Sequence, residues 1–190
     1  GAQEAILFDQ DSTPPANLVN VLSHELKGLN EIHPNVAAIG PTIFCELENR
    51  ILESSVDRVR PLTDALSDVN QLISSGMLIP RGAYETVGGM DEELFIDAVD
   101  HEWCWRAKKI ENSRFFVSEK AVISHQLGEG DKFFIIKNVA ISTPFRTYYQ
   151  YRNFFLLSRR NYVPLSWKFL NGFKYFVKLF YYPIFIPPRK

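Results

Sequence analysis

Near its beginning the chain reads Ala5-Ile6-Leu7-Phe8-Asp9-Gln10-Asp11-Ser12-Thr13-Pro14-Pro15, a short apolar run that ends in a polar turn. Such a run predicts a buried strand that stops before the prolines. Asp9 and Asp11 would then lie at the carboxyl end of a strand, where open α/β sheets bind ligands. Two carboxylates one residue apart can converge on Mg²⁺ or Mn²⁺, which prefer oxygen ligands. The alternative is a helix-capping loop, because Asp11, Ser12 and Thr13 are all good N-caps.

Strand and helix patterns alternate downstream of this turn. Apolar residues at helical spacing predict a helix over 16–29, and β-branched apolar residues predict a strand over 36–44. Residues 46–71 show no clear pattern. Beyond them we expect a strand at Met77–Pro80, helices over 82–88 and 98–110, strands over 115–117 and 121–124, and helices from 144 onward interrupted at Pro164 and Pro183. This alternation predicts an α/β fold in which helices flank a sheet.

The overall composition is that of a soluble globular protein. The chain has 190 residues, of which 46% are hydrophobic and 23% are charged, so a disordered chain is excluded. Two cysteines cannot form a disulfide framework, and they favour a reducing, cytoplasmic compartment. The uncharged stretch over 179–188 is too short and too rich in proline to cross a bilayer.

Charge and aromatic residues are distributed very unevenly. Residues 1–132 carry 11 Lys or Arg and all 22 acidic residues, whereas residues 133–190 carry 10 Lys or Arg, no acid and 18 of the 26 aromatic residues. We therefore expect the acidic and basic parts to face different partners. The predicted division is 1–143 for the α/β part and 144–190 for a basic, aromatic, helical tail.

The tail contains a helical pattern of its own. With residues 167–180 as a helix, one narrow face carries four phenylalanines and excludes the lysines: Phe169, Phe173, Phe176 and Phe180. That pattern is typical of an interfacial helix on an anionic membrane surface. The alternative is a helix that packs on the core and exposes its lysines. Single-stranded nucleic acid is a third option, but no recognised nucleic-acid motif accompanies the pattern.

Two further groups of residues have chemical potential. The stretch Asp97-Ala98-Val99-Asp100-His101-Glu102-Trp103-Cys104-Trp105-Arg106 places acids among aromatic residues at a helix start, where the helix dipole favours a carboxylate that can act as a base. The alternative is a solvated helix N-terminus. His125 follows an apolar strand, and its imidazole would complete a metal site begun by two carboxylates, or else it is a structural histidine.

These pieces occur in an order that resembles a known family. The segments are 6–12, Ser75-Gly76, 87–107, Ser124-His125-Gln126-Leu127-Gly128 and Tyr148-Tyr149-Gln150-Tyr151-Arg152-Asn153. Over residues 5–157 the chain resembles the family-2 inverting glycosyltransferases, specifically the bacterial dTDP-rhamnosyltransferase-like branch. The resemblance implies a GT-A fold, a single α/β domain built around a mixed sheet.

The resemblance also implies roles for individual residues. Asp9 and Asp11 match the Asp-X-Asp motif that binds the metal and the donor diphosphate, and His125 matches a histidine that completes the metal site. Asp100 matches the general base, while Val99 replaces the acid that usually precedes it, a role that Asp97 or Glu102 would take. The acceptor site is expected at Ser75, Gly76, Asp97, Glu102, Trp103 and Arg106, with Arg106 supporting the pocket through a carboxylate.

The implied activity is transfer of rhamnose, with inversion, from a dTDP- or UDP-linked donor to a saccharide or lipid-linked saccharide in cell-surface polysaccharide synthesis. Such a protein would act at the inner face of the cell membrane. In that family nucleotide-binding βαβ units precede the Asp-X-Asp motif, whereas here the motif begins at residue 9. We therefore expect a truncated chain that is weak or inactive alone, with a second copy or partner chain covering an exposed sheet edge. The alternative is an inactive transferase-like module that docks on a membrane or partner through its tail.

Overall fold

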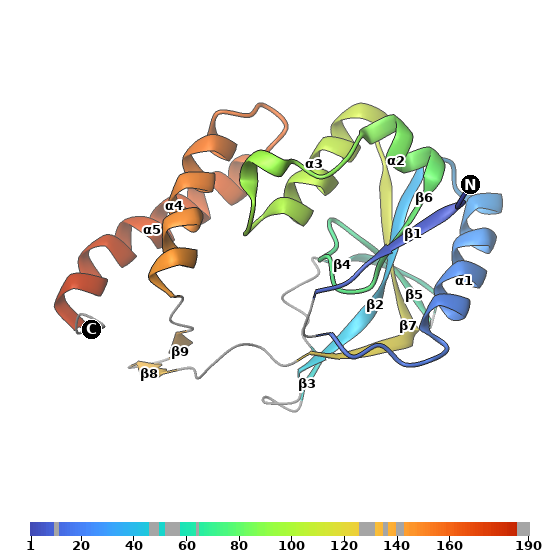
Figure 1. Ribbon diagram of the computed structural model, residues 1–190, viewed down its shortest axis with the longest axis horizontal. Coiled ribbons are helices and arrows are strands. Elements are labelled where there is room, and N and C mark those ends of the chain that lie inside the picture. The colour runs from blue at the N-terminus through green and yellow to red at the C-terminus, as the bar shows by residue number, and fades with distance from the viewer. Residues whose placement is uncertain are drawn as a thin grey trace.

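The computed structural model describes residues 1–9, 12–45, 50–51, 58–63, 65–125, 132–134, 137–139 and 143–185. Its centre is a seven-stranded mixed sheet with the order β1-β6-β2-β7-β5-β4, to which β3 adds by pairing with β2 (Figure 1). The pair β2–β7 is parallel and the other pairs are antiparallel. The strands are β1 (Glu4–Leu7), β2 (Val36–Cys45), β3 (Arg50–Ile51), β4 (Arg58–Thr63), β5 (Leu66–Val69), β6 (Met77–Pro80) and β7 (Arg114–His125).

Helices cover both faces of this sheet. They are α1 (Leu18–Ile32), α2 (Arg81–Val87), the 3₁₀ helix η2 (Glu92–Leu94) and α3 (Val99–Glu111). A two-stranded ribbon of β8 (Lys132–Phe134) and β9 (Lys137–Val139) precedes α4 (Pro144–Ser158) and α5 (Leu165–Phe185). The result is the mixed α/β architecture that the sequence pattern predicts, and it is consistent with the GT-A-like fold that the resemblance implies.

Two hydrophobic clusters hold the helices on the sheet. The leucines of α1 pack with Phe116, whereas Phe115 and Val117 pack on the opposite face with Trp103 and Cys104 of α3. This division follows from the strand period of two, which sends neighbouring side chains of β7 to opposite faces. Burial raises the pKa of the Cys104 thiol to about 12, so this side chain serves as a small apolar core residue.

The predicted elements are largely confirmed, with three differences. Residues 115–117 and 121–124 form one strand, β7, whose register shifts where Ser118 Oγ accepts from the backbone N–H groups of Lys120 and Ala121. The unplaced stretch 46–71 contributes β3, β4 and β5. Helix α5 ends at Phe185, two residues past Pro183, because a proline near a helix end removes only one backbone hydrogen bond.

Helices α4 and α5 lie together to one side of the sheet and contact the rest of the chain next to α3 (Figure 1). A third cluster of buried residues joins the two parts through Leu94, Trp105, Leu157 and Val163. The rings of Trp105 on α3 and Trp167 on α5 are 5.0 Å apart between centroids. Among the helices that the structure describes, none has the length and apolar character needed to cross a bilayer.

Candidate active site

Asp9 is held where β1 ends and β6 begins. Because β1 and β6 are antiparallel, the turn before β6 lies beside the end of β1, and Gly76 N donates to Leu7 O at 2.8 Å. Asp9 Oδ1 accepts from Ser74 Oγ at 2.8 Å, and Asp9 Oδ2 accepts from Ser75 Oγ at 2.5 Å. Gly76 has φ +80, and a Cβ there would lie 2.7 Å from Ile123 and Pro41 side chains, so only glycine fits this turn.

Asp100 reaches the same turn from the first turn of α3. Its Oδ2 accepts from Ser74 N at 3.1 Å, and its Oδ1 accepts from His101 N at 2.8 Å. Ser74 therefore binds both carboxylates, Asp9 through its hydroxyl and Asp100 through its backbone. The Asp100 side chain is 18% exposed, which leaves it accessible while the N-terminus of α3 favours its negative charge.

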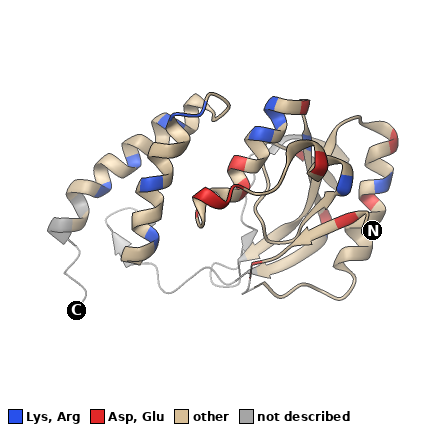
Figure 2. Cartoon of the chain, turned by 45° about the horizontal axis from the view of Figure 1, so that its top comes forward, with Lys and Arg blue, Asp and Glu red and all other residues tan. Residues whose placement is uncertain are grey.

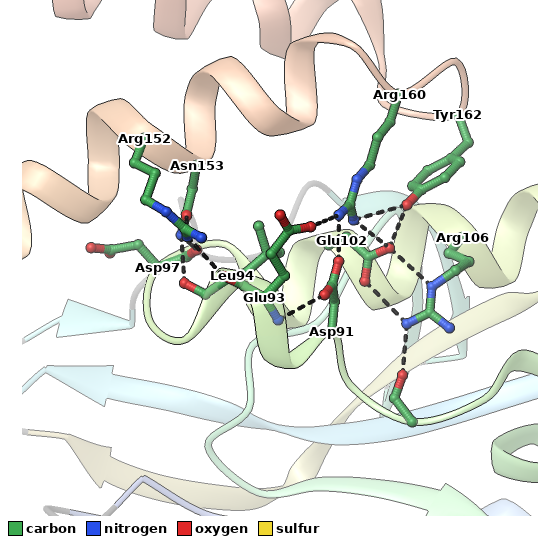
Figure 3. Close-up of polar contacts among 11 residues, drawn as sticks. Asp91, Glu93, Leu94, Asp97, Glu102, Arg106, Arg152, Asn153, Arg160 and Tyr162 are labelled. Atoms are coloured by element: carbon green, nitrogen blue, oxygen red, sulfur yellow. Dashed lines mark hydrogen bonds and ion pairs between the residues drawn. The ribbon is translucent and has the colours of Figure 1, made fainter.

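The loop before Asp100 has an unusual backbone. Phe95, Asp97 and Ala98 all have φ between 60° and 66°, a region that costs free energy for residues with a Cβ. The side chain of Asn153 on α4 lies across this loop: its Nδ2 is 2.9 Å from Leu94 O and 3.1 Å from Asp97 O (Figure 3). The same Nδ2 is 2.6 Å from Ile96 O. Asn153 is buried, so α4 fixes the loop that orients Asp100. Sequence reasoning included Asn153 in a motif but assigned it no role.

Asp97 carries an ion pair to the basic tail. Arg146 of α4 donates to it from Nε at 3.1 Å and from Nη2 at 2.9 Å. The hydrogen bond with Asp97 raises the pKa of Arg146, and the negative charges of Asp9 and Asp100 raise it further. Arg146 thus lies within the electrostatic field of both site carboxylates, a cation that sequence reasoning did not place here.

Exposed aromatic rings lie on the same two chain segments as this ion pair, Phe95 near Asp97 and Phe145 next to Arg146. The ring of Phe95 is 6.2 Å from that of Phe145 and 5.1 Å from that of Tyr149, and Tyr148 contacts Tyr149 at 5.2 Å. Phe95, Phe145 and Tyr148 are 65%, 59% and 61% exposed. We call Phe95, Phe145, Tyr148 and Tyr149 the aromatic cluster. Its open faces offer stacking surface beside Asp97.

Several residues expected at the acceptor lie behind the site instead. Trp103 and Glu102 are fully buried, and Ser75 and Gly76 are buried in the turn. Trp103 Nε1 donates to Gly88 O at 2.8 Å, and Arg106 donates to Val87 O at 2.5 Å and to Gly89 O at 2.7 Å. These side chains are largely enclosed by the protein in this structure, and their role at an acceptor stays a prediction. They brace the site from within.

Glu102 is the centre of a buried polar network. It accepts from Arg106 Nε at 2.9 Å and from Tyr162 Oη at 2.6 Å, and Arg160 Nη1 lies 3.3 Å away (Figure 3). Arg160 also pairs with Asp91 at 2.5 Å. Burial lowers the pKa of Arg160, but hydrogen bonds to Asp91 and Tyr162 outweigh it and raise the pKa overall.

This network corrects an expectation from the charge distribution. The acidic and basic parts of the chain also bind each other. Arg146, Arg152 and Arg160 of the basic part pair with groups of the acidic part, at Asp97, at the carbonyl of Glu93 and at Asp91. Charge complementarity therefore holds α4 and the loop after it against η2 and α3.

The other expected metal ligands are only partly within the described residues. Asp11 lies outside them, as does the side chain of His125. The backbone shows that Thr13 bridges to Ser124, the residue before His125, and that Ser12 Oγ donates to Ser75 Oγ at 3.2 Å. The turn after Asp9 therefore runs beside the end of β7. Among the described residues there is no group of three His, Cys, Asp or Glu side chains that could hold a metal ion.

The fold is a mixed α/β sheet, and open α/β sheets commonly bind ligands beyond the carboxyl ends of their strands, which is where Asp9 lies. A comparison with curated proteins then gives a specific likeness. The chain is 34% identical over 175 residues to the dTDP-rhamnosyl transferase RfbF of Shigella flexneri, and the match covers 87% of this chain and 56% of the relative. No family model matches. The likeness supports the resemblance to rhamnosyltransferase-like glycosyltransferases, and the chain spans little more than half the length of this relative.

Proposed function

We propose that this chain is the metal- and acceptor-binding part of an inverting glycosyltransferase that moves rhamnose from a dTDP-linked donor to a saccharide or lipid-linked saccharide acceptor in cell-surface polysaccharide synthesis. The observation that carries the proposal is the meeting of Asp9 and Asp100 at Ser74, at the edge of the sheet. The likeness to a dTDP-rhamnosyl transferase supports the donor.

In this proposal Asp100 is the general base. It accepts the proton of an acceptor hydroxyl while that oxygen bonds to the anomeric carbon of rhamnose. The bond from the anomeric carbon to the diphosphate oxygen breaks on the opposite side, and the nucleoside diphosphate leaves with the bonding electrons. One carboxylate is enough for this direct displacement, because the diphosphate needs no proton to leave.

Asp9 would hold a divalent cation together with Asp11 and His125. The described donors fit Mg²⁺ or Mn²⁺, since the Asp9 carboxylate and the hydroxyls beside it are all oxygen atoms. When bound, the cation neutralises negative charge on the diphosphate. Ser74 and Ser75 fix both oxygens of Asp9, so that its remaining lone pairs stay in place at the open edge.

The metal site is tested by binding rather than by turnover. We expect weak binding of dTDP that requires Mn²⁺, measured by calorimetry with and without EDTA. Asp9→Asn should lower the Mn²⁺-dependent affinity by about 10- to 100-fold, whereas Asp100→Asn should leave it unchanged. Glu85→Gln, which changes an exposed acid on α2, is the matched control. The metal assignment would be refuted if EDTA did not change the affinity for dTDP, or if Asp9→Asn bound dTDP as tightly as the unchanged protein.

For the acceptor we propose the surface formed by Asp97 and the aromatic cluster. Sugar rings present apolar C–H faces, and the exposed rings of Phe95 and Tyr148 offer flat apolar area next to a charged pair. Replacing Tyr148 with Ser should raise the acceptor KM by about tenfold and leave the donor KM unchanged, since about 1.4 kcal/mol is at stake. Phe155→Ser, an equally exposed change on α4, serves as control. Equal effects of the two changes would contradict this placement.

A second candidate is an inactive transferase-like module that docks on a membrane or a partner. The exposed apolar residues of α5 favour docking, but they are equally compatible with an active enzyme. The two candidates differ in the Mn²⁺-dependent binding of dTDP, which only the transferase should show.

A further inference from the structure

Helix α5 turns its apolar side away from the protein. Its exposed apolar residues, from 46% to 75% accessible, are Leu165, Phe169, Leu170, Phe173, Phe176, Val177, Leu179 and Phe180. The opposite side packs against the rest of the chain through Trp167 and Tyr175, whose rings contact Trp105 and Phe154. At 100° per residue the exposed residues cover one side of the helix. We call these eight residues the α5 apolar face.

Lysines border this face on both sides. Helical spacing places Lys168 along one border and Lys174 along the other, whereas Lys178 lies on the opposite side of the helix with Tyr175. Lys168 Nζ donates to Arg160 O at 2.8 Å, and Lys174 and Lys178 each have Nζ 5.9 Å from the ring of Tyr175. An apolar side between two cationic borders is the arrangement of a helix that lies in the headgroup region of an anionic bilayer.

The charges also decide between a bilayer and a second copy of the chain. In Figure 2 the charged residues of α4 and α5 are all basic, in agreement with the absence of any acid after residue 132. A symmetric dimer through the α5 apolar face would bring the same patch of each copy together, and hence lysine borders against lysine borders. Anionic lipid supplies the opposite charge along the whole helix, at about 1 kcal/mol per lysine near the surface.

We propose that the α5 apolar face is a membrane-docking surface that inserts into the interfacial region of a bilayer containing anionic lipid. The helix lies in the plane of the membrane, its phenylalanine rings enter the boundary between headgroups and acyl chains, and the two bordering lysines, Lys168 and Lys174, contact the lipid phosphates. Docking needs no nucleotide and no metal, so it stands or falls separately from the proposed function.

Vesicle sedimentation tests this surface. The whole chain is mixed, without nucleotide or Mn²⁺, with vesicles of phosphatidylcholine alone or with phosphatidylglycerol added at one part in three. We expect binding to the anionic vesicles that weakens in high salt. The triple change Phe169→Ser, Phe173→Ser, Phe176→Ser should lower the partition coefficient by about tenfold or more. Lys174→Gln, which removes one bordering charge, should lower it by about fivefold on anionic vesicles only.

Ile32→Ser is the matched control, since Ile32 on α1 is 73% exposed and far from α5 in the chain. It should bind vesicles as the unchanged protein does. Thermal unfolding confirms that each variant is folded, and sedimentation velocity measures self-association. Three results would each overturn the proposal: no binding to anionic vesicles, equal binding to neutral vesicles, or a solution dimer that the phenylalanine changes dissociate without any lipid binding.

Discussion

Asp100→Asn is expected to lower rhamnose transfer by about 10²- to 10⁴-fold, the usual contribution of a positioned general base. The amide cannot take the proton of the acceptor hydroxyl, but it is nearly the same size and its oxygen still accepts a backbone hydrogen bond. The hydrogen bonds to Asp100 come from the backbone N–H groups of Ser74 and His101, whereas Asp9 is held by the hydroxyls of Ser74 and Ser75. Transfer is measured with radiolabelled dTDP-rhamnose. The substitution is made in a form of the protein that transfers rhamnose when it carries no substitution.

The outcome separates catalysis from binding. Mn²⁺-dependent dTDP affinity should match that of the unchanged protein, because Asp100 binds neither ligand in this account. The melting temperature should fall slightly, because the amide keeps only one of the two backbone hydrogen bonds that Asp100 accepts. Glu85→Gln again serves as control and should transfer at the original rate. Full transfer by Asp100→Asn would remove the base from the mechanism, and lost dTDP binding would show that Asp100 serves the donor instead.

Glu102→Gln is expected to destabilise the fold by about 3–5 kcal/mol, the cost of removing one partner from a buried ion pair. Arg106 and Arg160 would then lose their shared counter-charge while they stay largely enclosed, at 20% and 21% side-chain exposure. For a chain of this size the melting temperature should fall by about 10 °C, measured by circular dichroism.

The comparison variant is Glu93→Gln. Glu93 also lies near Arg160, at 3.5 Å, but its side chain is 56% exposed, and an exposed pair contributes at most about 1 kcal/mol. Its melting temperature should therefore change little. Equal melting temperatures for the two variants would contradict the view that a buried network around Glu102 docks the loop after α4 onto α3.

The parts of the fold that the sequence predicts are those set by local patterns. The leucine spacing of α1 and the apolar run of β1 need no knowledge of distant residues. The local sequence pattern does not predict strands β3, β4 and β5. Strands β3 and β5 are short, and β4, at the edge of the sheet, contains arginines and a proline. β3 is a strand because it pairs with β2, β5 because it pairs with β7, and β4 because it pairs with β5, and such pairing leaves little trace in a local pattern.

The residues of the candidate site also divide into those that local sequence indicates and those that depend on long-range contacts. The turn after β1 and the acids at the start of α3 are evident from the sequence, and the family resemblance makes Asp9 and Asp100 candidate site residues. The enclosure of Glu102 depends on Tyr162 and Arg160, which lie about sixty residues away in the chain. Ser74 and Asn153 have no chemical signature of their own, and only the fold shows that each joins distant segments.

The central claim is that one cation is held by Asp9, Asp11 and His125, with Asp100 next to it. Crystals of the chain grown with Mn²⁺ and dTDP, measured by anomalous diffraction near the manganese edge, test it directly. We expect one strong anomalous peak within bonding distance of an Asp9 oxygen. The peak should lie near Ser74, the residue that donates hydrogen bonds to both Asp9 and Asp100. A well-ordered Mn²⁺–dTDP complex bound elsewhere on the chain, away from Asp9, would contradict it.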